Sequence, residues 1–247
     1  MRKATLICLV LLALAPALSQ AQPVIRATNG ILNASSALPD VAQGSWFVIY
    51  GTGLGPSTIA IQYPYTATLA GTSITFTPAS GGTPVSALLY YTLATQVAAM
   101  LPSSTPAGTY NVTVTYSGRP SAAVSANVVA RNFGFATQTA NGQGVGVVVI
   151  VNADGSEVEV GPTVPAKAGD ILTLYATGLG STSPSYSPGQ LPTSATSITG
   201  TLQVTIGSTT LPAANILYAG ISPLSAGLYQ INLRLPASLP SGKQPVR

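Results

Sequence analysis

The chain has 247 residues, of which only 6% are charged, and its nine basic and five acidic side chains give a formal charge of +4. It contains no histidine and one cysteine, which excludes histidine-based catalytic triads, Cys-His dyads and zinc sites built from histidine or several thiolates. Basic residues this sparse also exclude a nucleic-acid surface, which needs clustered lysine and arginine.

The segment Met1–Ala21 has the pattern of a secretory signal peptide. Two basic residues precede an apolar run over Ala4–Leu18, and small residues at Ser19 and Ala21 mark a cleavage site. The run is shorter than the roughly 20 apolar residues that a membrane span takes, and a proline breaks it. Cleavage would remove Cys8, the only thiol. We therefore predict a secreted mature chain, in the extracellular space, at the cell surface or in the periplasm, without disulfide or membrane span.

Frequent turn residues between short β-branched runs predict an all-β protein without helices of any length. The chain has 25 glycines and 20 prolines, and valine and threonine fill the segments between them. Tyr110–Tyr116 alternates apolar and polar residues, which indicates a half-buried antiparallel strand. We expect Tyr110 to form a tyrosine corner at its head. The Asp-Gly pair in Asn152–Ser156 predicts a tight hairpin turn.

The chain repeats itself. Gly44–Gly55 and Gly169–Gly180 match at an offset of 125 residues. The residues of this shared signature include Tyr50, Gly53 and Gly55 in the first copy, and Tyr175, Gly178 and Gly180 in the second. A Gly-Leu-Gly turn that recurs in this way is structural rather than phosphate-binding, and we expect Gly53 and Gly178 to adopt positive φ.

A second match covers the segments that follow each signature. From Gln96/Gln230 onward the copies align at an offset of 134 residues, and Leu217-Tyr218 matches Leu89-Tyr90. A repeat of this length predicts two tandem domains, over residues 22–130 and 131–247. Trp46–Tyr50 is apolar on both faces, so we expect it to be covered on both sides or to lie at the domain junction. The Ser/Pro-rich segment Gly178–Thr196 reads as a variable surface loop.

These segments resemble the IPT/TIG branch of immunoglobulin-like domains, and more closely an uncharacterised C-terminal domain family of secreted acidobacterial proteins. The matching segments are Asn33-Ala34-Ser35, Gly44–Gly55, Asn152–Gly155, Gly169–Gly180 and Gly227–Asn232 leading to Leu235-Pro236. The resemblance implies two tandem immunoglobulin-like β-sandwiches and a secreted location. It implies no activity and brings no catalytic residues.

The second domain is expected to lack its last strand. At the offset of 134, Arg247 aligns with Thr113, and the first domain continues for 17 residues beyond that point, to Ala130. Either the sequence is a fragment, or a strand from another chain or from Gln22–Leu32 fills the gap. The second alternative predicts self-association.

The carboxylates offer two further hypotheses. Glu157 and Glu159 share one face of a predicted strand, which would suit a weak glycosidase or a carbohydrate-active accessory module. A solvated strand face explains the same pattern more simply. A calcium site would take its oxygen ligands from Asn152, Asp154, Ser156 and Glu157, although the hairpin turn already accounts for the Asp-Gly pair. We predict no cofactor and no metal.

Tyrosine is the residue type most suited to binding in this chain, since it gives rigid, amphipathic contact area. Five tyrosines lie near predicted loops and strand ends, and they form the predicted binding surface: Tyr63, Tyr65, Tyr90, Tyr91 and Tyr186. The alternative is that they line the edge of a β-core. The sequence thus predicts a non-enzymatic, secreted or cell-surface adhesion module that binds an unknown protein or glycan, or that spaces other modules.

Overall fold

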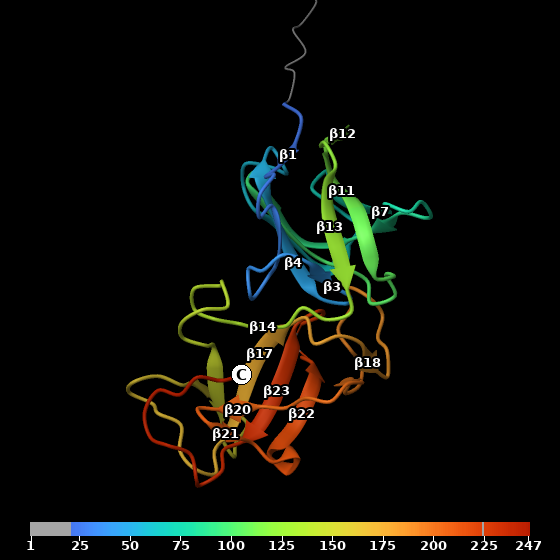
Figure 1. Ribbon diagram of the computed structural model, residues 1–247. Coiled ribbons are helices and arrows are strands. Elements are labelled where there is room, and N and C mark those ends of the chain that lie inside the picture. The colour runs from blue at the N-terminus through green and yellow to red at the C-terminus, as the bar shows by residue number, and fades with distance from the viewer. Residues whose placement is uncertain (1–20, 224) are drawn as a thin grey trace, which may run out of the picture.

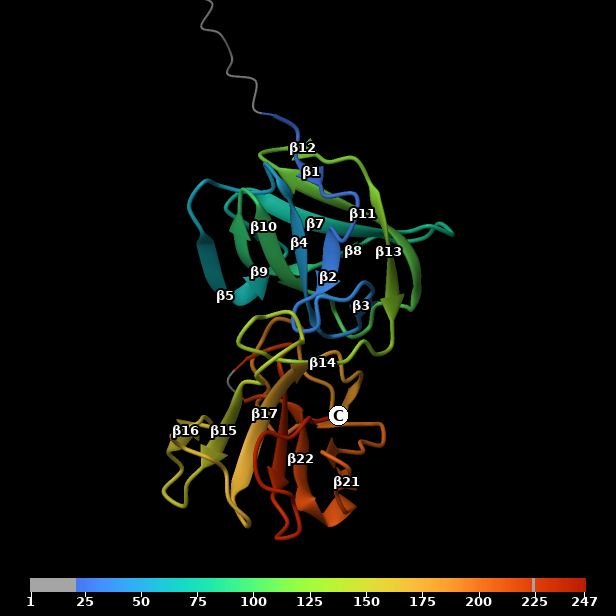
Figure 2. The same ribbon diagram turned by 60° about the vertical axis from the view of Figure 1, so that its left-hand side comes forward.

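The computed structural model describes residues 21–223 and 225–247, so the predicted signal peptide lies outside the described part except for Ala21. The all-β prediction is confirmed, because the only helical element among the described residues is the 3₁₀ turn η1 (Ala213–Asn215). The strands between Val24 and Val129 form one group of sheets, here called the N-terminal unit, and those between Gly134 and Arg234 form another, here called the C-terminal unit. The two units lie end to end (Figures 1 and 2). Among the described residues, no helix has the length and apolar character that crossing a membrane demands.

Two sheets form the N-terminal unit. The first has the order β1-β4-β10-β9-β5, with β2 also paired to β4. Its strands are β1 (Val24–Ile25), β2 (Ile31–Asn33), β4 (Trp46–Thr52), β5 (Ala60–Thr66), β9 (Leu88–Leu93) and β10 (Gln96–Met100). The second has the order β3-β13-β11-β7-β6, with β12 on β11 and β8 on β7. Its strands are β3 (Val41–Ala42), β6 (Thr68–Leu69), β7 (Thr72–Pro78), β8 (Val85–Ser86), β11 (Gly108–Tyr116), β12 (Arg119–Pro120) and β13 (Val124–Val129).

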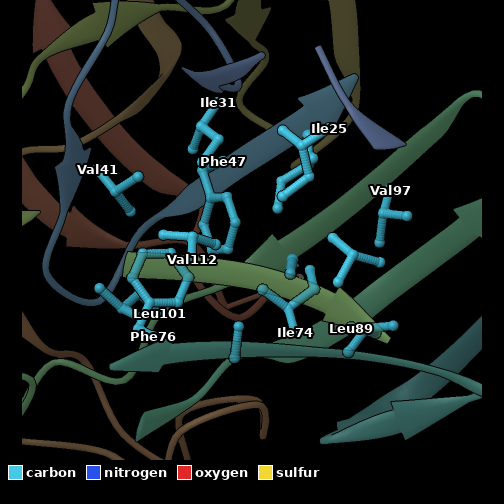
Figure 3. Close-up of a cluster of buried hydrophobic side chains, with 14 of the residues drawn as sticks. Ile25, Ile31, Val41, Phe47, Ile74, Phe76, Leu89, Val97, Leu101 and Val112 are labelled. Atoms are coloured by element: carbon cyan, nitrogen blue, oxygen red, sulfur yellow. The ribbon is translucent and has the colours of Figure 1, made fainter. Parts of the chain in front are cut away.

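A hydrophobic core fills the space between these two sheets (Figure 3). Phe47 from β4 meets Phe76 from β7 edge to face, with ring centroids 5.4 Å apart. The predicted alternation of β11 is confirmed, since Tyr110, Val112 and Val114 are buried while residues between them are exposed or half-buried. Each such apolar side chain contributes about 1.5–3 kcal/mol when it leaves water, so this face holds the two sheets together.

The C-terminal unit has one large sheet and one small one. The large sheet has the order β16-β15-β17-β23-β22-β19-β18, with β14 also on β17. Its strands are β14 (Gly134–Phe135), β15 (Val148–Val151), β16 (Glu157–Glu159), β17 (Ile171–Thr177), β18 (Thr182–Ser183), β19 (Ser197–Ile198), β22 (Ile216–Ile221) and β23 (Tyr229–Arg234). The small sheet pairs β20 (Thr205–Ile206) with β21 (Thr209–Thr210). Asn152–Ser156 forms the predicted hairpin turn between β15 and β16, with a bond from the Asn152 N–H to the Ser156 carbonyl.

Strand register reproduces the sequence repeat. Tyr50 of β4 pairs with Gln96 of β10, and Tyr175 of β17 pairs with Gln230 of β23. The offsets of 125 and 134 residues therefore join the same pair of positions in each unit. An isolated antiparallel bridge joins Ile206 to Val246, the residue that the offset of 134 matches to Val112, and Val112 pairs with Phe76 of β7. The expectation that the C-terminal unit lacks its last strand stays a prediction. The alternative in which Gln22–Leu32 fills that gap is wrong, because β1 and β2 pair with β4 of the N-terminal unit.

One part of the sequence alignment is wrong by a single residue. Tyr91 pairs with Ala98 and Tyr218 pairs with Asn232, so Tyr218 corresponds to Tyr91, whereas the sequence had matched it to Tyr90. The β-bulge beside these pairs lies at the equivalent position in both units, so it does not shift one copy against the other. The Leu-Tyr pair that the alignment used recurs one residue out of register, and identity of letters alone does not reveal such a shift.

The signature glycines serve two purposes. Gly53 and Gly178 adopt φ of +64° and +78°, which confirms the prediction for both, and Gly180 has φ of +96°. Gly55 does not have positive φ. A Cβ at that position would overlap the hydroxyl oxygen of Thr92, so glycine is needed there for close approach of the backbone.

Candidate functional site

Three of the five predicted binding tyrosines lie where the two units meet. Tyr65, Tyr90 and Tyr186 belong to an apolar cluster, here named the junction cluster. Its members are Trp46, Tyr65, Leu88, Tyr90, Met100, Tyr186 and Ala226. The Trp46 and Tyr90 rings stack with centroids 5.2 Å apart. The expectation that Trp46–Tyr50 lies at the junction is therefore confirmed for Trp46.

Burial removes Tyr65 from the predicted surface and half-covers Tyr186. Tyr65 is only 6% exposed, and its hydroxyl lies 3.4 Å from that of Ser225 in the C-terminal unit. Tyr186 accepts a hydrogen bond from the Gly227 N–H, and burial raises its pKa to about 12. The sequence placed these side chains on a surface because tyrosine near a turn resembles a binding residue, whereas here packing of the two units covers them.

The segment predicted as a variable surface loop also belongs to this junction. The Tyr65 N–H donates to the Gly189 carbonyl at 3.1 Å, and the Leu191 N–H donates to the Tyr63 hydroxyl at 2.7 Å. Tyr63 itself remains 49% exposed at the rim. The segment Gly178–Thr196 therefore contacts the N-terminal unit through its backbone, which the sequence did not indicate.

A buried polar network joins the units beside the aromatic cluster. The Asn33 side chain accepts a hydrogen bond from Thr177 Oγ1 at 2.8 Å and donates one to the Asn132 carbonyl at 2.7 Å. Ser45 Oγ accepts a hydrogen bond from the Gly178 N–H at 2.8 Å. The signature turn of the second copy is thus bound to the first unit, and these contacts fix how the two units are oriented.

The fifth predicted tyrosine, Tyr91, lies on a different surface, the outer face of the first sheet. Ile49 and Val97 point into the core, and the Thr92 hydroxyl donates to Thr72 of the second sheet, so the residues next to these three in β4, β10 and β9 point outward. We name the outward set the tyrosine face. It consists of Tyr50 on β4, Tyr91 on β9, Gln96 on β10, Ile61 on β5, and Arg26 directly after β1.

Side chains of the tyrosine face contact one another. Gln96 Nε2 donates to the Tyr91 hydroxyl, and the guanidinium carbon of Arg26 lies 5.1 Å from the centroid of the Tyr50 ring. Burial raises the pKa of Tyr91, and the neighbouring Tyr50 adds to this shift. Ile61 is 59% exposed. The face therefore combines partly exposed rings, an amide and one cation in a fixed arrangement.

A hollow of about 380 Å³ adjoins this face. Its lining residues are Val24, Arg26, Tyr50, Gly51, Thr52 and Thr95. Arg26 is held at its edge by two backbone carbonyls, because Nε donates to Thr28 at 3.1 Å and Nη2 donates to Asn29 at 2.6 Å. Sequence reasoning found Tyr50 only as part of a structural signature and did not single out Arg26 or Gln96. The signal that could have found Gln96 is its recurrence as Gln230.

The equivalent face of the C-terminal unit has different chemistry. Tyr175, Gln230 and Tyr218 occupy the positions of Tyr50, Gln96 and Tyr91. The Tyr218 hydroxyl donates toward the carbonyls of Thr196 and Ile221, within this unit. Burial raises the pKa of Tyr175, and the negative charge of Glu157 adds to the effect. The second face therefore has a carboxylate next to Tyr175 where the first has Arg26 next to Tyr50, and it carries Arg234 farther along β23.

The two glutamates of the glycosidase hypothesis lie on β16, the edge strand of the large sheet. Both side chains are exposed, and Glu159 accepts a hydrogen bond from Gln138 Nε2 at 3.0 Å. Neither glutamate lines the hollow beside Arg26 or the second hollow, of about 200 Å³, next to Asp40.

Asp154, one of the side chains considered as calcium ligands, is occupied within its own turn. Asp154 Oδ1 accepts hydrogen bonds from the N–H and hydroxyl of Ser156, which lower the Asp154 pKa. Among the described residues, no group of three or more acidic or metal-binding side chains surrounds one point. The prediction that this turn is a hairpin accounts for Asp154 fully.

Comparisons with protein-family models, with curated proteins and with solved structures gave no match to the chain. The candidate site is therefore defined by the strand register and side-chain contacts given above.

Proposed function

We propose that the mature chain is a non-enzymatic, secreted or cell-surface binding module that recognises a glycan or another protein, or that spaces other modules. The tyrosine face is the observation that carries this proposal. Tyr50, Tyr91 and Gln96 lie on adjacent strands, partly exposed and beside a hollow, which suits a surface that binds by contact area and hydrogen bonds. Secretion rests on the pattern of residues 1–21.

We also propose that both units are immunoglobulin-like β-sandwiches of the IPT/TIG type. The Tyr110 hydroxyl donates to the Pro106 carbonyl at 2.9 Å, which is the predicted tyrosine corner and a feature of such sandwiches. The matched registers of Tyr50 with Gln96 and Tyr175 with Gln230 support the idea that one ancestral unit was duplicated.

No contact favours the glycosidase alternative over the binding module. A glycosidase needs two carboxyl groups that flank a bound sugar ring, whereas Glu157 and Glu159 lie exposed on an edge strand. The chemistry of the tyrosine face, which holds no carboxylate, points to recognition rather than catalysis.

Binding to an array of glycans and secreted proteins tests the proposal, with the mature chain, residues 22–247, as the probe. The double variant Tyr50→Ala/Tyr91→Ala should lose binding, while Tyr116→Ala on β11, in the opposite sheet, should keep it. Loss of binding by both variants, or by neither, would contradict the site. A parallel hydrolysis screen covers the alternative, and turnover that Glu157→Gln or Glu159→Gln abolishes would overturn the non-enzymatic proposal.

A further inference from the structure

We propose that the tyrosine face binds a linear polysaccharide that carries carboxylate groups, of the polyuronate type. This inference rests on the proposed binding function and names its ligand class. Arg26 is the residue that would pair with a carboxylate, while Tyr50 and Tyr91 would pack against sugar rings.

The dimensions of the face favour a chain over a single sugar. Tyr50, Gln96, Tyr91 and Ile61 lie on four neighbouring strands, in the order β4-β10-β9-β5. Three strand spacings of about 4.8 Å give a track of about 14 Å, which is longer than one sugar ring. Aromatic rings along such a track offer flat apolar area to the C–H faces of successive sugars.

Charge distribution around the face favours an anionic ligand. Four of the five carboxylates of the chain lie in the C-terminal unit: Asp154, Glu157, Glu159 and Asp170. The fifth, Asp40, accepts a hydrogen bond from Asn127 Nδ2 and lines a separate hollow. Arg26 is therefore the charged member of the tyrosine face, and no carboxylate of that face competes for it.

The guanidinium of Arg26 is already positioned for a partner. Backbone carbonyls of Thr28 and Asn29 take two of its N–H groups, and its guanidinium lies over the Tyr50 ring. A guanidinium has five N–H donors in a rigid fork, so three remain for a ligand within the described part of the chain. Because these contacts hold Arg26 in place, pairing with a carboxylate would cost little side-chain entropy.

The equivalent face of the C-terminal unit provides an internal contrast. Glu157 lies beside Tyr175 there, at the position that corresponds to Tyr50. A carboxylate there repels an anionic ligand at the position that Arg26 occupies in the N-terminal unit, and the cation of this face, Arg234, pairs with Ile171, four residues away from Tyr175. The inference therefore assigns the ligand to the N-terminal unit alone.

Affinity measurements by calorimetry with two forms of one polymer test the inference. The mature chain is titrated with polygalacturonate oligomers and with the same oligomers after methyl esterification, which removes the charge. We expect esterification and Arg26→Gln each to weaken binding about tenfold or more, the effect of losing a charged hydrogen bond. Arg26→Lys, which keeps the charge but not the fork, should fall between. Arg119→Gln is the matched control, since it removes the same charge from β12 in the opposite sheet.

The possible results separate the inference from the proposed function. Binding of charged and esterified oligomers with equal affinity, unaffected by Arg26→Gln, would overturn the acidic ligand but keep a glycan-binding face. Equal losses for Arg26→Gln and Arg119→Gln would show a non-specific charge effect and overturn the site. Tighter binding of a sulfated polymer than of polygalacturonate would contradict the carboxylate assignment. If no glycan binds while a secreted protein binds through Tyr50 and Tyr91, the glycan inference fails and the binding module remains. Circular dichroism of each variant confirms folding.

Discussion

Thr177 Oγ1 donates a hydrogen bond of 2.8 Å to Asn33 Oδ1 inside the junction, although the two residues are 144 positions apart in the chain. Asn33 is 2% exposed and Thr177 is fully buried. The same Asn33 oxygen also accepts bonds from the N–H groups of Ser35 and Ser36. The Asn33 side-chain amide therefore stabilises a turn of the N-terminal unit and binds β17, the signature strand of the C-terminal unit.

Replacing this amide should destabilise the whole protein. Asn33→Ala leaves the buried Thr177 hydroxyl and the Asn132 carbonyl without their partner, and each unsatisfied buried polar group costs about 1–3 kcal/mol. We expect a loss of about 3 kcal/mol in the free energy of unfolding. Urea titration followed by fluorescence of Trp46, the single tryptophan and a member of the junction cluster, measures it. Asn111→Ala, at an exposed position on β11, is the control and should cost under about 0.5 kcal/mol.

Replacement by alanine should destabilise the protein much more at Gly178 than at Gly53. Both have positive φ, where a Cβ costs about 1 kcal/mol. At Gly53 the nearest atom to an added Cβ, Pro23 Cα, lies 3.8 Å away, so Gly53→Ala should cost little more than that. At Gly178 the added Cβ would overlap the Asn132 carbonyl, so Gly178→Ala should cost several times as much. Thermal melts of both variants compare them, and equal decreases in Tm would refute this difference.

The tyrosine corner should contribute a single hydrogen bond to stability. Tyr110→Phe removes the bond to the Pro106 carbonyl but keeps the buried ring, so we expect a loss of about 1 kcal/mol. Tyr116→Phe, the matched control on the same strand, should stay within about 0.5 kcal/mol of the parent protein. A Tyr110→Phe variant as stable as its control would show that the corner has no energetic role.

Stability should fall at alkaline pH because of two tyrosines, Tyr186 in the junction cluster and Tyr229 in the core of the C-terminal unit. Burial raises the pKa of Tyr186 to about 12 from an ordinary value of 10.0, and it raises that of Tyr229 further. Between about pH 10 and about pH 12, Tyr186 has lost its phenol proton in the unfolded chain and has kept it in the folded chain. The stabilising contribution is therefore complete below about pH 10 and is lost as the pH rises towards about 12.

Urea midpoints measured across this interval test the alkaline prediction. The Tyr186→Phe variant has no phenol to ionise, so its midpoint should decrease less steeply with pH than that of the parent protein. Tyr63→Phe is the control, since Tyr63 is 49% exposed. If Tyr186→Phe and Tyr63→Phe follow the same curve, burial of Tyr186 does not govern the alkaline loss.

Local pattern predicted the elements that depend only on neighbouring residues. The alternation in Tyr110–Tyr116 predicted its buried face, since side chains of a strand point alternately to opposite sides. The Asp-Gly pair predicted the hairpin, and repetition of the Gly-Leu-Gly turn predicted positive φ at Gly53 and Gly178. These features follow from backbone sterics within a few residues.

The local sequence pattern could not predict which tyrosines are exposed. Tyr65 and Tyr91 have similar neighbours in the sequence, yet the first is buried at the junction and the second lies on the tyrosine face. The difference depends on segments far along the chain, because Ala226 and Tyr186 cover one part of the sheet and leave the other part open.

By itself, then, the sequence determined the all-β class and the repeated signature. It also excluded the catalytic and metal-binding chemistry that needs histidine or several thiolates. Only the tertiary structure decided that Arg26, Tyr50, Gln96 and Tyr91 share one face, and that Asn33 binds Thr177. The physical reason is distance along the chain. Strand alternation and turn sterics are local, whereas the register of a sheet and the packing of two units join residues far apart in sequence, and a single bulge shifts which of them meet.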